Sequence, residues 1–174
     1  MITGYDVAMA AVNSGLLGTP YSKLDCQAFV EKVLYAVGIR HNYRGSNDMW
    51  RNLVHDRQLV RGGAAPLGSL AFIVKNDGGE TKRGYHDDMG NATHVAIVIG
   101  DGKTMESTTG GVQYGKLSRF TYYGLINGVS YEEGGIEDAG ERPTDLARLL
   151  QMVQVLRDNI DEMEVYIRDI YGGS

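Results

Sequence analysis

The chain has 174 residues, of which 43% are hydrophobic and 22% charged; its formal net charge is -5 and its sequence pI is near 5.3. A chain of this length buries a core without the help of disulfides or metals. Its acidic balance argues against nucleic acid as a partner. The single cysteine, Cys26, excludes an internal disulfide, so its role is either packing or chemistry.

Membrane insertion and export signals are not expected from this sequence. The first residues lack a basic region followed by an apolar run, which a signal peptide requires. No window approaches the about 18 consecutive apolar residues of a membrane-spanning helix. We therefore expect no membrane insertion and no signal peptide in this chain.

Two helices are expected near the N-terminus. Residues 5–17 carry apolar side chains at roughly helical spacing and are followed by Gly18 and Pro20, which stop a helix. The second helix has a clearer pattern, with apolar positions at Phe29, Val30, Val33, Leu34 and Val37. Asp25 is its expected N-cap and Gly38 its stop, which places Cys26 in the first turn.

Strands are expected in the second half of the chain. Residues 47–59 hold a short helix, and residues 75–93 form a long polar loop, suited to a lid or a specificity loop. The strongest strand signal is the run HVAIVI at residues 94–99. The other predicted strands are 69–74, the hairpin partner 104–107, and one or two strands within 112–129.

The C-terminal part of the chain has a different character. Residues 132–142 are acidic, contain glycine and show no periodicity, which indicates a linker between a domain at 1–131 and a helix at 143–171. Between residues 146 and 170, apolar residues recur at alternating spacings of three and four, which is a heptad pattern. A parallel homodimeric coiled coil is the simplest outcome, and a helix folded back on its own domain is the alternative.

Cys26 stands where a nucleophilic thiol is favoured. The unpaired N–H groups and the dipole of a helix start stabilise a thiolate relative to a thiol. Position alone does not distinguish this role from packing, because free cysteines are among the most buried residues. Other groups must therefore accompany the thiol.

His94 and Glu106 are the groups expected to accompany it. His94 opens the strongest strand and shares a face with Ala96 and Val98, small residues that would leave room for a helix start. A two-residue turn would put Glu106 on the wrong face. A three-residue turn at residues 100–102 would pair it with Ala96, within reach of His94.

Three segments resemble the NlpC family of cell-wall peptidases when taken in order: GTPYSKLDCQAFVEKVLYAVGI, LGSLAFIV and HVAIVIGDGKTMES. The resemblance covers about residues 5–129. It implies an α+β, papain-like fold in which N-terminal helices pack on an antiparallel sheet. It also implies that Cys26 is the nucleophile and His94 the base, with Tyr21 and Asp25, the residue before Cys26, at the oxyanion and substrate-binding region.

The chain departs from the family pattern at three places, one of which is a shorter segment between Tyr21 and Cys26. Gln27-Ala28 follows the cysteine where the family commonly has Ser-Gly, and Glu106 takes the third polar position, usually a histidine. A carboxylate can hold the imidazole tautomer and stabilise the imidazolium. The related CHAP amidases and endopeptidases also use an acidic residue with Cys and His.

The function implied by the resemblance is hydrolysis of an amide bond in the stem peptide of bacterial peptidoglycan, of the D-glutamyl-diamino acid type, without a cofactor or metal. Two alternatives stay open: a CHAP-like N-acetylmuramoyl-L-alanine amidase, and a catalytically idle wall-binding or phage tail protein. The resemblance also suggests the catalytic part of a longer phage or prophage lysin that acts on the cell wall.

Overall fold

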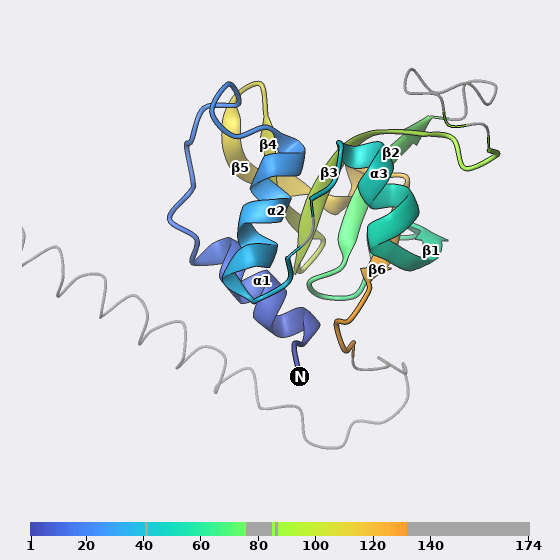
Figure 1. Ribbon diagram of the computed structural model, residues 1–174, viewed down its shortest axis with the longest axis horizontal. Helices are drawn as coiled ribbons and strands as arrows, with labels where there is room; N and C mark the ends of the chain where they lie inside the picture. The colour runs from blue at the N-terminus through green and yellow to red at the C-terminus, as the bar shows by residue number, and fades with distance from the viewer. Residues whose placement is uncertain (41, 76–84, 86, 132–174) are drawn as a thin grey trace, which may run out of the picture. The chain divides into compact units, whose positions relative to one another are not determined.

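The computed structural model describes residues 1–40, 42–75, 85 and 87–131 (Figure 1). The described residues all belong to one compact unit of the chain. The predicted linker at 132–142 and the predicted heptad helix at 143–171 lie outside the described residues, and so does most of the predicted loop at 75–93.

The helices precede most of the strands. In chain order they are α1 (Gly4–Val12), α2 (Cys26–Ala36), α3 (Ser46–Asp48) and the π-helical turn η1 (Met49–Leu53), with a short 3-10 helix η2 (Leu117–Arg119) near the end. Among the described residues, no helix has the length and apolar character needed to cross a membrane.

The first helix is shorter than its apolar pattern predicts. It ends at Val12 rather than at residue 17, with Asn13 as its C-cap. Gly15 and Gly18 follow with φ angles of 65° and 79°, a left-handed conformation that a helix cannot continue through. The apolar residues beyond Val12 therefore belong to a loop.

The start of α2 matches its prediction. The Asp25 carboxylate accepts a hydrogen bond of 2.8 Å from the backbone N–H of Ala28 and caps the helix. The helix ends at Ala36, just before Gly38, whose φ is 88°. Cys26 is thus the first residue of α2.

Removal of this cap should destabilise the protein. Because Asp25→Ala leaves an N–H of the first turn without its carboxylate, we expect a loss of about 1 kcal/mol in the free energy of unfolding. Chemical denaturation of the variant and the parent protein measures the difference. Asp25→Asn, which keeps an accepting oxygen, should lose much less; an equal loss in both variants would contradict the capping role.

Within the described residues, six strands form one antiparallel sheet in the order β1-β6-β2-β3-β4-β5. Their bounds are β1 (Val54–Leu59), β2 (Leu70–Lys75), β3 (Asn91–Gly100), β4 (Lys103–Thr108), β5 (Gly111–Lys116) and β6 (Tyr122–Ile126). Helices on an antiparallel sheet make this an α+β fold, as predicted.

Two strand boundaries differ from the predictions. The short helix predicted within 47–59 ends at Leu53, and β1 follows it. The sequence of β1, VHDRQL, is too polar to indicate a strand, and its conformation comes from pairing with β6. In the same way β3 begins at Asn91, inside the predicted loop, because Asn91 pairs with Lys75 of β2.

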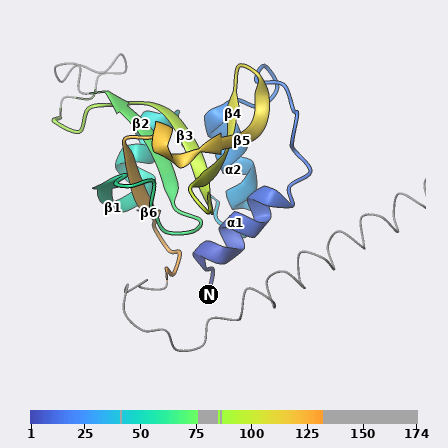
Figure 2. The same cartoon turned by 180° about the vertical axis from the view of Figure 1, so that it is seen from behind.

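The sheet buries side chains on both faces. On one face α1, α2 and α3 all pack on β3, and Figures 1 and 2 show these helices on the same side of the sheet. Val95 and Ile97 of β3 belong to this larger core. Ala96 and Val98 point the other way and pack with Leu117 and Phe120. The segment that joins β5 to β6 therefore covers the second face.

Candidate active site

Cys26 lies almost buried at the start of α2, with 8% of its surface exposed. The segment before it is tied to the sheet, because the buried hydroxyl of Ser107 in β4 donates a hydrogen bond to the carbonyl of Leu24. Ser107 follows Glu106 in β4. This bond therefore places the helix start beside the strand that carries Glu106, a contact that no pattern in the sequence indicates.

His94 contacts both of the groups expected beside it. Its Nε2 lies 2.6 Å from Oε2 of Glu106. The Cys26 thiol and the His94 imidazole also interact, and each changes the pKa of the other. Because Nε2 faces Glu106, Nδ1 is the ring nitrogen left for the thiol. Phe120 stacks on the imidazole, with ring centroids 5.8 Å apart and planes at 23°.

One prediction about the surroundings of His94 is wrong. We expected the small residues on its face, Ala96 and Val98, to leave room for the helix start. They instead lie beneath Leu117 and Phe120, and α2 packs on the opposite face. The thiol therefore meets the imidazole at the beginning of β3 and not above its small residues.

The β3–β4 hairpin has the predicted register but a different turn. Ile97 pairs with Met105, the register in which Ala96 lies opposite Glu106. The turn comprises two residues, Asp101 and Gly102, both left-handed at φ angles of 50° and 66°. A bulge between Val98 and Gly100 supplies the extra residue that we assigned to the turn. In this register Glu106 lies within hydrogen-bond distance of His94.

Glu106 is fully buried and holds two partners at once. Its Oε2 faces His94, and its Oε1 accepts a 2.8 Å hydrogen bond from Nη1 of Arg119. A buried carboxylate requires such compensation, since removing a charge from water costs several kcal/mol. Space for it comes from Gly115 of β5, where a Cβ atom would lie only 1.8 Å from Oε1.

Substitution of this glycine should displace the carboxylate. A methyl group in Gly115→Ala cannot share the space of Glu106 Oε1, so we expect a loss of stability of about 1–3 kcal/mol from overpacking. We also expect a loss of reactivity at Cys26, measured by the rate of iodoacetamide alkylation. Gly110→Ala is the matched control, because its Cβ would have no contact shorter than 3.4 Å. Wild-type alkylation in Gly115→Ala would refute the arrangement.

The site favours a thiolate–imidazolium pair. Burial raises the pKa of Cys26, but the hydrogen bond and the charge of His94 outweigh it and lower that pKa below its ordinary value. Burial likewise lowers the pKa of His94, whereas hydrogen bonds to Cys26 and Glu106 outweigh burial and raise that pKa to about 9. Since the two groups titrate as a pair, both shifts describe one proton transfer from thiol to imidazole.

These shifts predict a plateau in the dependence of reactivity on pH. A reaction that uses the thiolate as nucleophile and the imidazolium as acid should become faster as pH increases through the lowered pKa of Cys26, where the thiolate forms. Its rate should fall as pH increases through about 9, where His94 loses the proton that a leaving amine requires. Initial rates measured from about pH 4 to about pH 11 test this pH dependence. A decline that begins near pH 6.5, the ordinary pKa of histidine, would contradict the pairing.

Tyr21 and Asp25 take different positions. The Tyr21 hydroxyl lies 3.9 Å from Sγ of Cys26 and donates a hydrogen bond to it. Burial and the neighbouring thiolate raise the pKa of Tyr21, so this hydroxyl keeps its proton. The Asp25 side chain is exposed and directed to the backbone of Ala28. Its observed contact is therefore that of a helix cap.

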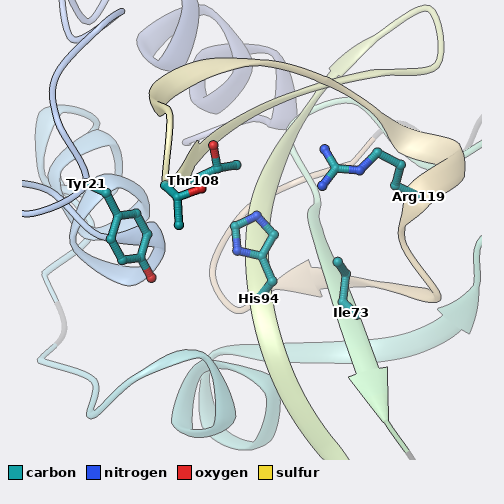
Figure 3. A pocket seen from close by; sticks show the side chains of 6 residues that line it. Tyr21, Ile73, His94, Thr108 and Arg119 are labelled. Carbon is teal, nitrogen blue, oxygen red and sulfur yellow. The ribbon is translucent and has the colours of Figure 1, made fainter.

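An open pocket lies against the imidazole. It is lined by Tyr21, Ile73, His94, Thr108, Thr109 and Arg119. Figure 3 shows the His94 ring between Tyr21 and Thr108 on one side and Arg119 and Ile73 on the other. A substrate entering this pocket would meet the imidazole and the hydroxyl that contacts the thiol.

The carboxylate of Asp87, near the end of the long loop, binds an arginine. In the described part of the chain, no group of three or more His, Cys, Asp and Glu side chains is suited to hold a metal ion. Asp87 is held by both of its oxygens to Arg51, at 2.8 and 2.6 Å. It therefore helps to fix the end of the loop.

The antiparallel sheet and the helix that begins at Cys26 define a domain with the NlpC/p60 fold. The NlpC/p60 domain of the peptidoglycan hydrolase SagA superposes with a TM-score of 0.54 at 21% identity, covering 72% of this chain and 100% of that domain. The P60 domain of the M. avium subspecies paratuberculosis antigen MAP1204 gives a TM-score of 0.50 at 17% identity, covering 71% and 96%. The fold implied by the family resemblance is thus confirmed.

A third similar structure is an NlpC/p60 family protein from Bacillus cereus ATCC 10987, at 24% identity and a TM-score of 0.49, covering 68% of this chain and 40% of that one. No protein-family model and no curated protein matches the sequence.

Proposed function

We propose that this protein is a cysteine peptidase that hydrolyses an amide bond in the stem peptide of bacterial peptidoglycan. The observation that carries the proposal is the 2.6 Å contact between His94 and the buried carboxylate of Glu106, together with the interaction by which His94 lowers the pKa of Cys26. Support for the substrate comes from the similar domains, one of which belongs to a peptidoglycan hydrolase.

Each residue has a defined role in this reaction. The Cys26 thiolate attacks the amide carbonyl carbon and forms a tetrahedral oxyanion. The carbon–nitrogen bond then breaks, His94 donates its proton to the leaving amine, and a thioester remains on Cys26. Water attacks this thioester, His94 accepts a proton from it, and the thiolate leaves. Glu106 holds Nε2–H throughout and stabilises the imidazolium.

The oxyanion needs hydrogen-bond donors close to the thiol. The backbone N–H of Cys26 lies at the helix start, where N–H groups have no partner within the helix. The Tyr21 hydroxyl, which points to Sγ, is the second donor. A donor at this position contributes about 10²- to 10³-fold to the rate in acyl-transfer enzymes.

Purified cell walls test the proposal and identify the bond. After digestion, mass spectrometry of the soluble fragments should show a new amino terminus on a diamino acid, as expected for cleavage after D-glutamate. A new L-alanine amino terminus would instead identify the amidase alternative. Intact stem peptides after prolonged digestion, at a protein concentration that binds walls, would favour the catalytically idle alternative and overturn the proposal.

A further inference from the structure

The chemistry of the site leaves Arg119 without a role, although it touches Glu106. Its guanidinium lies beside the pocket with 49% of its side chain exposed, whereas the carboxylate that it binds is fully buried. Surface ion pairs contribute little to stability. Here, however, one partner is buried and also holds the imidazole, so the consequence of the contact is chemical.

The geometry points to Arg119 as a positioning residue that fixes which oxygen of the residue 106 side chain faces His94. Arg119 is a donor only, so the atom opposite its Nη1 must be an acceptor. His94 Nε2, which must carry a proton in the imidazolium, needs an acceptor as well. The side chain at position 106 must therefore present two acceptors in opposite directions.

A carboxylate meets this demand and an amide does not. Glu106 presents Oε1 to Arg119 and Oε2 to His94. In Glu106→Gln one of the two positions must hold an NH₂ group. With Arg119 in place, the amide oxygen is drawn to the guanidinium and the NH₂ group faces His94. That orientation opposes the imidazolium and therefore the thiolate of Cys26.

Arg119→Met should have opposite effects on the reactivity of Cys26 in the parent protein and in the Glu106→Gln background. In the parent protein, Arg119→Met should reduce the reactivity of Cys26, because Glu106 loses the partner that fixes it. In the Glu106→Gln background, the same change should increase reactivity, because the amide is then free to turn its oxygen to His94. The effect of Arg119→Met thus reverses sign.

Alkylation of Cys26 by iodoacetamide at neutral pH measures this without a substrate. The inference rests on the catalytic arrangement proposed above, but its readout does not depend on the bond that is cleaved. We compare the rate constants of the parent, Arg119→Met, Glu106→Gln and the double variant. For each background we divide the rate constant with Arg119→Met by the rate constant without it. This ratio should be about tenfold higher in the Glu106→Gln background than in the parent. A double variant that is alkylated no faster than Glu106→Gln alone overturns the inference, and one that is alkylated faster supports it.

Two further variants separate positioning from a general loss of charge. Arg40→Met removes an exposed arginine that lies beyond the far end of α2 and should leave the alkylation rate unchanged. Arg119→Lys retains a donor and should recover most of the rate lost in Arg119→Met. Should Glu106→Gln fail to fold, equal rates in Arg119→Met, Arg119→Lys and the parent would overturn the inference.

Discussion

Cys26→Ala should reduce hydrolysis of cell-wall peptide by at least about 10⁴-fold, the scale on which removal of a nucleophile acts in covalent catalysis. The sequence contains no second cysteine that could replace this thiol. The alanine side chain also fits the space that Cys26 occupies in the core at the start of α2. The fold should therefore survive the change.

Thermal unfolding and the rate of product release measure the two effects separately. An unchanged midpoint with an absent product is the expected result. Cys26→Ser is the matched variant, because it retains a polar atom at the same place; its hydroxyl is a far weaker nucleophile at neutral pH and should be almost as inactive. Product formation in Cys26→Ala near the parent rate would end the nucleophile assignment.

Glu106→Ala should lower the rate of hydrolysis by about 10²- to 10⁴-fold, since the imidazole loses the acceptor that selects its tautomer. The pKa of His94 should fall from about 9, because the hydrogen bond and charge of Glu106 contribute to raising it. The alkaline decline in rate should accordingly move to lower pH. Arg119, left without its partner, is half exposed and can turn to water.

The pH dependence distinguishes this role from a loss of packing. Glu31→Ala is the matched control: it shortens a carboxylate on α2 that binds the backbone N–H of Tyr43 and has no contact with the site. It should leave the alkaline limit of the rate unchanged. A full rate and an unchanged pH profile in Glu106→Ala would reduce the site to a dyad of Cys26 and His94.

The parts of the site predictable from sequence are those governed by local rules. A helix start after Asp25 follows from capping, and alternation along HVAIVI places His94 and Ala96 on one face of a strand. The register of β4 was predicted from the requirement that Glu106 reach His94. The observed register agrees with this prediction, although a bulge and a two-residue turn produce the register instead of a longer turn.

The remaining parts depend on contacts between distant segments. Arg119 lies 13 residues beyond Glu106, in a 3-10 turn with no periodic pattern. Gly115 is one of 24 glycines in the sequence. Its role, to leave space for the Glu106 carboxylate, follows only from the position of Glu106 in the folded sheet. Strand β1 is polar and owes its conformation to β6. Such features follow from pairing across the sheet, which local sequence does not encode.

The most direct test of the central claim is to find the covalent intermediate on Cys26. Digestion of soluble stem peptide is stopped with acid during the first turnovers, and the protein is mapped by mass spectrometry. The account predicts an added mass equal to the amino-terminal part of the substrate, carried as a thioester by the fragment that contains Cys26. Normal turnover by the protein after complete alkylation of Cys26, with no adduct on that fragment, would contradict it.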